Sequence, residues 1–169
     1  MIRLWKLPSG SMKEANCLNF MIEGVVVKKI IKHSDDRSFF AELVKSGENT
    51  FHKIMQTSYS ETKPGVVKAF HLHDYWEIWC VIKGKAKVVL LDMRLDSPTK
   101  NQTEVIYTGE DDMSAIAIPP GVGHGYEVLG ASNMGIIYHS EEAYDPENVT
   151  IKNIPPDSPE INLDWKSLK

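Results

Sequence analysis

Cysteine and long apolar runs are both scarce in this sequence of 169 residues. Its two cysteines, Cys17 and Cys80, lie in apolar surroundings without a close partner, which predicts reduced core thiols rather than a disulfide framework. No apolar stretch approaches the roughly 20 residues of a membrane-spanning helix. The first residues carry Arg3, Lys6 and Lys13 and no continuous apolar block, which is unlike a secretory signal. We therefore expect a cytoplasmic protein without a membrane partner.

Positive charge is not in excess either. Lysine and arginine number 19 against 23 aspartates and glutamates, a formal net charge of −4, so we expect no nucleic acid partner. With 42% apolar and 25% charged residues, the composition is that of a globular protein and excludes a disordered or collagen-like chain. The length predicts one domain, 1–169, with a core over about 24–152 and an extended tail at 153–169 that contains three prolines.

Helical periodicity is also rare. Only Ser11–Glu14 fits a capping box, which predicts a helical turn or two near the N-terminus. The rest consists of short runs rich in β-branched and aromatic residues, separated by turn signals such as Lys63-Pro64-Gly65 and Pro119-Pro120-Gly121. This pattern predicts an all-β sandwich or small barrel. The expected strands are 24–31, 39–44, 51–57, 66–72, 76–82, 85–92, 103–108, 114–118, 126–129 and 134–138.

Two histidines and a glutamate are concentrated in one short stretch. Residues two apart in a strand point to the same face, so His71 and His73 should project together. If residues 74 and 75 form a turn, Glu77 on the following strand reaches the same space. A carboxylate in such an apolar strand is costly to bury unless it is paired or bound to a metal. Another histidine, His124, directly follows the proline–glycine turn.

These residues resemble the two motifs of the cupin superfamily. The first motif, G(X)5HXH(X)3-4E(X)6G, is matched at every spacing by Gly65, His71, His73, Glu77 and Gly84. The second, G(X)5PXG(X)2H(X)3N, is matched by Pro119, Gly121 and His124, whereas Met113 and Val128 stand in place of its first Gly and its Asn. The resemblance implies a cupin jelly-roll β-barrel with little helix.

The same resemblance implies a metal site. In cupins, the residues that correspond to His71, His73, Glu77 and His124 bind a divalent metal inside the barrel. Such a mixed nitrogen and oxygen ligand set suits Fe, Mn, Ni, Cu, Co or Zn, and no organic cofactor is expected. The alternative is that these are pocket histidines whose hydrogen bonds are satisfied without a metal.

A longer stretch, from about Ser34 to Trp165, resembles one cupin branch, the dTDP-4-dehydrorhamnose 3,5-epimerase family. Segments 36–42, 65–71 and 91–99 are similar to its D-x-R-G-F-F-x-E, G-V-L-R-G-L-H and D-x-R-x-x-S-P-T motifs. Segments 118–126, 138–146 and 161–165 are similar to its I-P-P-G-x-A-H-G-F, Y-x5-Y-x-P and I-x-x-D-W motifs. The family resemblance implies a homodimer that acts on a nucleotide-linked 4-keto-deoxysugar in polysaccharide biosynthesis.

The family resemblance also implies roles for individual residues. The substrate, a dTDP-type sugar nucleotide, would be held by Arg37, Phe40, Glu42, Gln56, Lys68 and Tyr144. Lys68 stands where the family has arginine, which keeps the charge but loses the bidentate fork. Epimerisation next to the ketone needs a base and an acid on opposite faces of the sugar. His71 matches the family's base and Tyr138 its acid.

Two departures leave the function open. Glu77 replaces the family's lysine, and no aspartate follows Trp165 to orient the base. Three functions therefore remain: an epimerase-like isomerase, a metal-dependent cupin enzyme of another class such as an oxygenase or lyase, and a sugar- or metabolite-binding protein without turnover. Because the metal ligands are complete while the base lacks its partner, we expect a metal-bound site in which His71 is a ligand.

Overall fold

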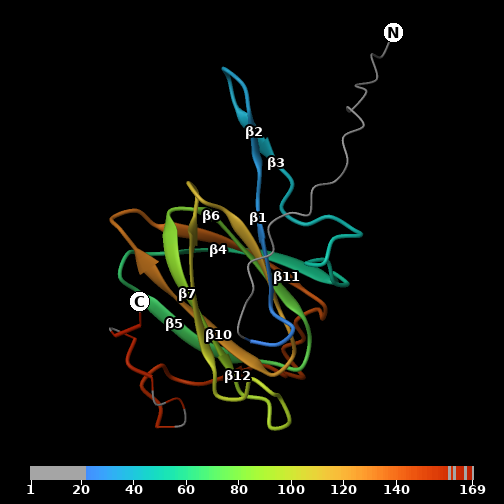
Figure 1. Ribbon diagram of the computed structural model, residues 1–169, viewed down its shortest axis with the longest axis vertical. Helices are drawn as coiled ribbons and strands as arrows, with labels where there is room; N and C mark the ends of the chain where they lie inside the picture. The colour runs from blue at the N-terminus through green and yellow to red at the C-terminus, as the bar shows by residue number, and fades with distance from the viewer. Residues whose placement is uncertain (1–21, 160, 162, 166, 169) are drawn as a thin grey trace.

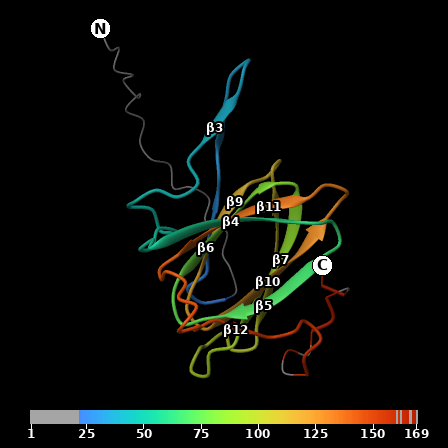
Figure 2. The same cartoon turned by 180° about the vertical axis from the view of Figure 1, so that it is seen from behind.

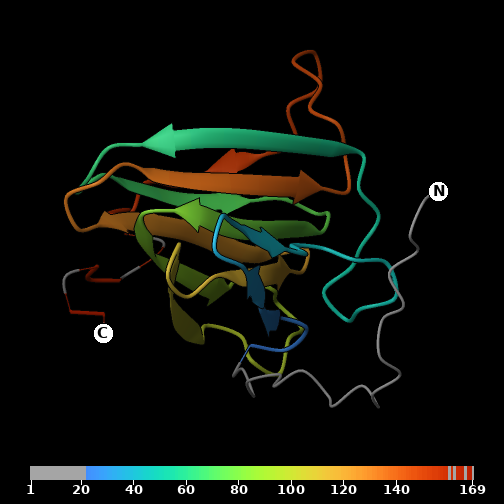
Figure 3. The same cartoon turned by 90° about the horizontal axis from the view of Figure 1, so that it is seen from above.

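The computed structural model describes residues 22–159, 161, 163–165, 167 and 168. Within these residues the protein has strands and turns but no helix, and two antiparallel five-stranded sheets pack face to face (Figures 1 and 3). The expected all-β jelly-roll fold is thus confirmed. No helical segment among the described residues has the length and hydrophobicity of a transmembrane span. The capping box at residues 11–14 lies outside the described residues.

Ten of the strands form the two layers. The first sheet has the order β1 (Val26–Lys29), β9 (Ser114–Ile118), β6 (Glu77–Lys83), β11 (Met134–Ser140) and β4 (Gln56–Thr62). The second has the order β12 (Lys152–Asn153), β5 (Val67–Leu72), β10 (Val122–Leu129), β7 (Lys85–Asp92) and β8 (Thr103–Gly109). Alternate residues of both sheets face inward and form a shared apolar core, which includes Trp79, Val88, Leu90, Ile116 and Tyr126.

A separate hairpin, β2 (Lys32–Ser34) and β3 (Phe39–Ala41), extends away from the two sheets (Figures 1 and 2). Its phenylalanines are unusually exposed, with 51% of Phe39 and 65% of Phe40 accessible to solvent. Because the hairpin projects from the sheets, these two large apolar side chains are not buried in the core and form an exposed apolar surface.

The expected strand over 51–57 is wrong, because residues 51–55 are irregular and β4 begins at Gln56. β4 is an edge strand whose inward residues are polar, so it lacks the apolar alternation that identifies a half-buried strand. The tail also differs from a free coil. β12 pairs with β5, and Ile154, Ile161 and Trp165 are buried against the outer face of the second sheet.

The D-x-R-x-x-S-P-T segment, residues 92–99, is held in place by a network of hydrogen bonds to Asp92. The buried Asp92 carboxylate accepts hydrogen bonds from Arg94 Nε at 2.9 Å, Ser97 Oγ at 2.5 Å and Thr99 Oγ1 at 2.6 Å. Burial raises the pKa of Asp92, but these hydrogen bonds outweigh it and hold the pKa well below its usual range. Because Arg94 Nη2 also donates to the Glu23 carbonyl oxygen at 2.7 Å, this hydrogen-bond network links the β7–β8 loop to the segment just before β1.

A register shift between β5 and β10 decides which residues of β5 face inward. His71 pairs with His124 and Lys68 pairs with Tyr126, so three steps along β5 match two steps along β10. Paired residues of antiparallel strands share a face, and both His124 and Tyr126 point into the core. The shift therefore turns Lys68 and His71 to the same inner face, although regular alternation would place them on opposite faces.

We predict that Gly125→Ala destabilises the fold, because Gly125 lies opposite this shift. A Cβ atom at Gly125 would lie 2.4 Å from Ala69 Cβ and 2.8 Å from the Lys68 carbonyl oxygen. Overpacking against backbone typically costs about 1–3 kcal/mol, which urea unfolding measures. The matched control is Gly123→Ala on the same strand, whose Cβ would meet chiefly the flexible Met93 side chain at 2.9 Å. Equal losses in the two variants would contradict the prediction.

Candidate active site

Three buried side chains meet at the centre of the sandwich. Glu77 begins β6, His124 lies in β10, and His73 follows β5. The Nε2 atoms of His73 and His124 lie 3.4 Å and 3.3 Å from the same carboxylate oxygen, Glu77 Oε2. One potential ligand atom from each residue lies within 4.8 Å of the other two. Both sheets thus contribute to a compact histidine–glutamate–histidine cluster.

The second ring nitrogen of each histidine determines where its proton lies. His73 Nδ1 is 2.9 Å from the Tyr75 carbonyl oxygen, and His124 Nδ1 is 2.9 Å from the Val122 carbonyl oxygen. A carbonyl oxygen only accepts, so each Nδ1 must donate its hydrogen. In the neutral ring Nε2 then has a lone pair, and His124 Nε2 is buried without a hydrogen-bond donor. Three potential ligand atoms, the two Nε2 atoms and Glu77 Oε2, therefore converge at one point.

Two further side chains hold the Glu77 carboxylate. Trp79 Nε1 donates to Oε2 at 2.7 Å, and Ser140 Oγ donates to Oε1 at 3.0 Å. Burial raises the pKa of Glu77, but His124 and His73 outweigh this effect and hold the pKa well below its usual range. The carboxylate is therefore ionised and fixed in orientation.

His71 lies beside this cluster rather than in it. Its ring centroid is 6.1 Å from that of His124, and the compact group of ligand atoms comprises His73, Glu77 and His124 without His71. The expectation of four converging ligands is thus met by only three of them. Burial lowers the pKa of His71 to about 4, and the proximity of His124 acts in the same direction. The imidazole is therefore neutral near pH 7.

Tyr138 faces the same interior from the opposite sheet. Its ring packs edge-on against Trp79, with the centroids 5.5 Å apart, and Trp79 in turn packs against His124 at 4.8 Å. Burial raises the pKa of Tyr138, so the phenol keeps its proton at neutral pH. The base candidate on β5 and the acid candidate on β11 thus come from the two facing sheets.

Part of the expected substrate site adjoins this interior. The Tyr144 backbone N–H donates to Gln56 Oε1 at 2.8 Å, so these two residues lie together. Tyr144 also lines a hollow of about 140 Å³ with Tyr75, whose ring stacks on His73 at 4.1 Å. Lys68 joins the inner face through the register shift of β5.

The other three expected substrate residues lie elsewhere. Arg37 is in the exposed turn of the β2–β3 hairpin, where it pairs with Asp35 at 2.9 Å. Phe40 is on β3, and the exposed Glu42 just after it pairs with Lys45 at 3.2 Å. Since the hairpin projects from the sheets (Figure 1), a single chain does not bring these residues to His71.

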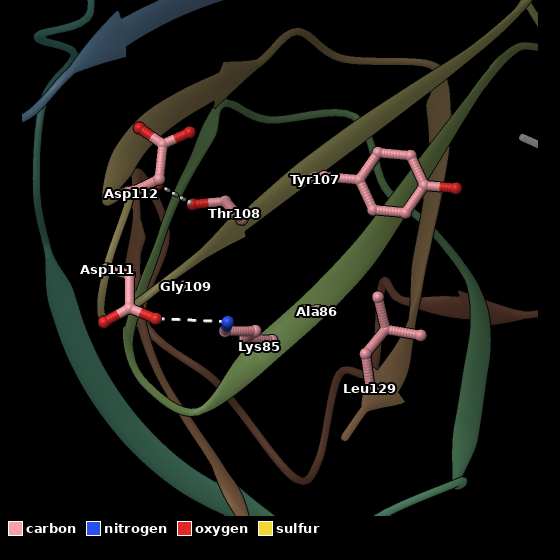
Figure 4. A pocket seen from close by; sticks show the side chains of 8 residues that line it. All are labelled: Lys85, Ala86, Tyr107, Thr108, Gly109, Asp111, Asp112 and Leu129. Atoms are coloured by element: carbon pink, nitrogen blue, oxygen red, sulfur yellow. Dashed lines mark hydrogen bonds and ion pairs between the residues drawn. The ribbon is translucent and has the colours of Figure 1, made fainter.

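A hollow of about 170 Å³ is also present at a different place (Figure 4). It is bordered by Lys85 of β7, Tyr107 of β8 and the turn that contains Asp111. Lys85 and Asp111 form an ion pair there at 3.1 Å. None of the expected catalytic or ligand residues lines it.

Sequence reasoning missed several residues of the site. Trp79 lies two positions after Glu77 on one strand, so alternation alone indicates that both face inward. Ser140 and Ser60 gave no comparable signal in the sequence. Ser140 contacts Glu77 and Ser60 contacts Tyr138 only because strands that are distant in sequence pair with each other.

Comparison with known proteins agrees with this geometry. The family model for dTDP-4-dehydrorhamnose 3,5-epimerase matches residues 19–169. The spore coat polysaccharide biosynthesis protein SpsL of Bacillus subtilis is 48% identical over 148 residues, which cover 87% of this chain and 98% of that protein. The probable low-salt glycan biosynthesis epimerase Agl13 of Haloferax volcanii is 31% identical over 149 residues, which cover 86% and 96%.

Solved structures support the same assignment. The dTDP-6-deoxy-D-glucose-3,5-epimerase RmlC of Legionella pneumophila, in complex with dTDP-4-keto-L-rhamnose, is similar with a TM-score of 0.78 at 25% identity, covering 89% of this chain and 82% of that chain. The dTDP sugar isomerase of Desulfovibrio desulfuricans shares the fold with a TM-score of 0.82 at 21% identity, covering 90% and 97%. The chain therefore belongs to the dTDP-4-dehydrorhamnose 3,5-epimerase family.

Proposed function

We propose that this protein epimerises a dTDP-linked 4-keto-deoxysugar during the synthesis of a polysaccharide. Family membership and the relatives SpsL and Agl13 support the pathway class. The similar Legionella pneumophila enzyme, whose structure contains dTDP-4-keto-L-rhamnose, supports the substrate class.

The observation that carries the proposal is the placement of the base and acid candidates on opposing sheets. His71 reaches the interior from β5 and Tyr138 from β11. Inversion requires that a proton leaves one face of a carbon and returns to the other. A sugar ring between the sheets would present one face to the imidazole and the other to the phenol.

The mechanism follows from the state of these two groups. The neutral His71 ring takes the hydrogen next to the C4 ketone, and the electron pair of the broken C–H bond moves to the ketone oxygen as an enolate. Tyr138 then gives its phenolic proton to the opposite face of the carbon. Solvent returns a proton to the tyrosine and removes one from the histidine, which completes the cycle.

We predict that deuterium exchange separates the two steps. With dTDP-4-keto-6-deoxyglucose in D2O, His71→Ala should lose both C–H exchange and inversion by about 100-fold or more, because general bases contribute that much. Tyr138→Phe should retain exchange and lose inversion. Proton NMR follows both, and Tyr107→Phe, at an exposed position on the other hollow, is the control. Exchange at the wild-type rate in His71→Ala would contradict the assignment.

We further propose that His73, Glu77 and His124 hold one divalent transition metal. Two imidazole nitrogens and a carboxylate oxygen form a set suited to Fe, Mn, Ni, Cu, Co or Zn. Both histidines donate their other ring hydrogen to a backbone carbonyl, as metal-binding histidines commonly do. When bound, such a metal would supply positive charge that stabilises a keto oxygen. One of its ligands, Glu77, stands where the family has a lysine. His71 remains free to act as the base.

We predict that metal content distinguishes this three-residue site from a four-ligand site of the cupin type, which would add His71 to His73, Glu77 and His124. Elemental analysis after dialysis against each of the six metals should find about one ion per chain in the wild type and in His71→Ala. His73→Ala should lose the ion, because it removes a ligand without touching the base. Loss of metal in His71→Ala would make His71 a ligand, and a metal-free wild type under all six conditions would reject the site.

We also propose a homodimer. Phe39 and Phe40 are exposed and would be stabilised by an apolar partner surface. The same hairpin carries Arg37, which does not reach the interior of its own chain. The outer face of the first sheet is apolar as well, with the half-buried Ile82 and Ile137 and the exposed Tyr59. A second copy of the chain would cover these surfaces and present its hairpin to a neighbouring site.

We predict that sedimentation velocity finds a particle of twice 19.1 kDa for the wild type. Phe40→Asp should weaken the association at least about tenfold, because it places an unpaired charge in an apolar contact. Tyr107→Asp is the control on a different surface. A 19.1 kDa monomer over a wide concentration range would overturn the proposal.

A further inference from the structure

Ser60 belongs to a row of polar side chains that line one border of the interior. It lies on the edge strand β4, whose residues 56, 58, 60 and 62 pair with inward-facing residues of β11. Among them, Ser60 Oγ is 3.0 Å from Tyr138 Oη, and Thr62 Oγ1 is 2.8 Å from Tyr126 Oη. The hydroxyl groups of β4 therefore hold two tyrosines that face the site.

The proposed role of Tyr138 as a proton donor determines which oxygen donates in the hydrogen bond between Ser60 and Tyr138. Either oxygen is able to donate in the resting protein. Once the Tyr138 hydrogen points at a substrate carbon, its oxygen has no hydrogen left for Ser60, so Ser60 must be the donor. The bond becomes charge-assisted as the phenol loses its proton, and hydrogen bonds to charged groups are the stronger kind.

We propose that Ser60 is a positioning residue that orients Tyr138 and stabilises the tyrosinate formed when Tyr138 protonates the enolate. The inference rests on the proposed epimerase function and deepens it. In the step, the Tyr138 O–H bond breaks, a C–H bond forms on the sugar, and the negative charge moves from the enolate to the Tyr138 oxygen. The Ser60 O–H bond stays intact and donates to that oxygen throughout.

The surroundings of Tyr138 disfavour its charged form. Burial raises the pKa of Tyr138, and the nearby Tyr126 and Glu77 act in the same direction. The hydrogen bond with Ser60 acts in the opposite direction. Ser60 therefore favours the charged form in a site whose other features disfavour it.

The test measures exchange and inversion separately in D2O with dTDP-4-keto-6-deoxyglucose. Ser60→Ala should keep wild-type C–H exchange, because His71 performs that step, while inversion falls by about 10- to 100-fold, the effect of losing a hydrogen bond to a charged group. Ser60→Thr retains the hydroxyl and should restore inversion. Ser58→Ala is the matched control: its hydroxyl accepts from Gln56 Nε2 at 2.9 Å, so its ratio of exchange to inversion should not change.

The outcomes separate this inference from the proposed function. If the wild type inverts the sugar and Ser60→Ala does so equally fast, or if exchange and inversion fall together, Ser60 has no specific role with Tyr138. If the wild type shows neither exchange nor inversion, the proposed function fails.

A second measurement tests Ser60 without turnover. Difluorotyrosine placed at position 138 has an intrinsically more acidic phenol, which absorbance titration can follow. Removal of the Ser60 hydroxyl should raise the pKa of this phenol, and Ser60→Thr should restore it. An unchanged pKa in Ser60→Ala would overturn the inference whatever the substrate proves to be.

Discussion

The ionised carboxylate of Glu77 is the constraint around which the interior is organised. A charge at the centre of a protein is stable only when it is surrounded by donors or cations. Here Trp79 Nε1 and Ser140 Oγ supply two donors, and the Nε2 atoms of His73 and His124 lie 3.4 Å and 3.3 Å from it. Each histidine donates its Nδ1 hydrogen to a backbone carbonyl oxygen, which leaves both Nε2 atoms facing the carboxylate, where the proposed metal would bind.

The family resemblance implies a lysine at the position of Glu77, so the charge at this point of the site is reversed in this chain. An enolate oxygen needs positive charge nearby, and a carboxylate alone would oppose it. The paired histidines would offset that change if, with Glu77, they hold the metal proposed above. His71 lies outside the cluster, with its ring 6.1 Å from His124. The proposed base and the proposed metal site therefore use different nitrogens, although the two family resemblances assigned both roles to His71.

Much of the site was visible in the sequence because strands alternate with a fixed period. Spacing alone indicated that His73 and Glu77 would meet, and motif resemblance added His124. The sequence does not show how the strands are aligned with one another. The register shift that turns Lys68 inward and the pairing of Ser140 with Glu77 depend on neighbours far away in the chain. β4 was misplaced because an edge strand lined with serine and threonine has no apolar alternation.

The outcome for His71 has a related cause. The HxH spacing correctly indicated that His71 and His73 both reach the interior, but a shared face does not mean a shared ligand position. His71 lies on β5, where it is paired with His124 of β10, whereas His73 lies just beyond the end of β5. The two rings therefore enter the interior at different depths, half-buried for His71 and buried for His73.

The two strands that border the candidate site, β4 and β5, lie at or next to the edges of their sheets, and each is reinforced in a different way. Among the described residues no strand lies beyond β4, and its inward hydroxyl groups hold Tyr138 and Tyr126. β5 is covered by the C-terminal tail, which adds β12 and the buried Ile154. Lys87, buried beneath the tail, donates to the Trp165 carbonyl at 2.8 Å and pairs with Glu127 at 2.7 Å. Open edges leave room for a ligand but expose unpaired backbone groups. The tail pairs with residues 70–72 of β5, the strand that carries His71, while the polar row of β4 faces the candidate site.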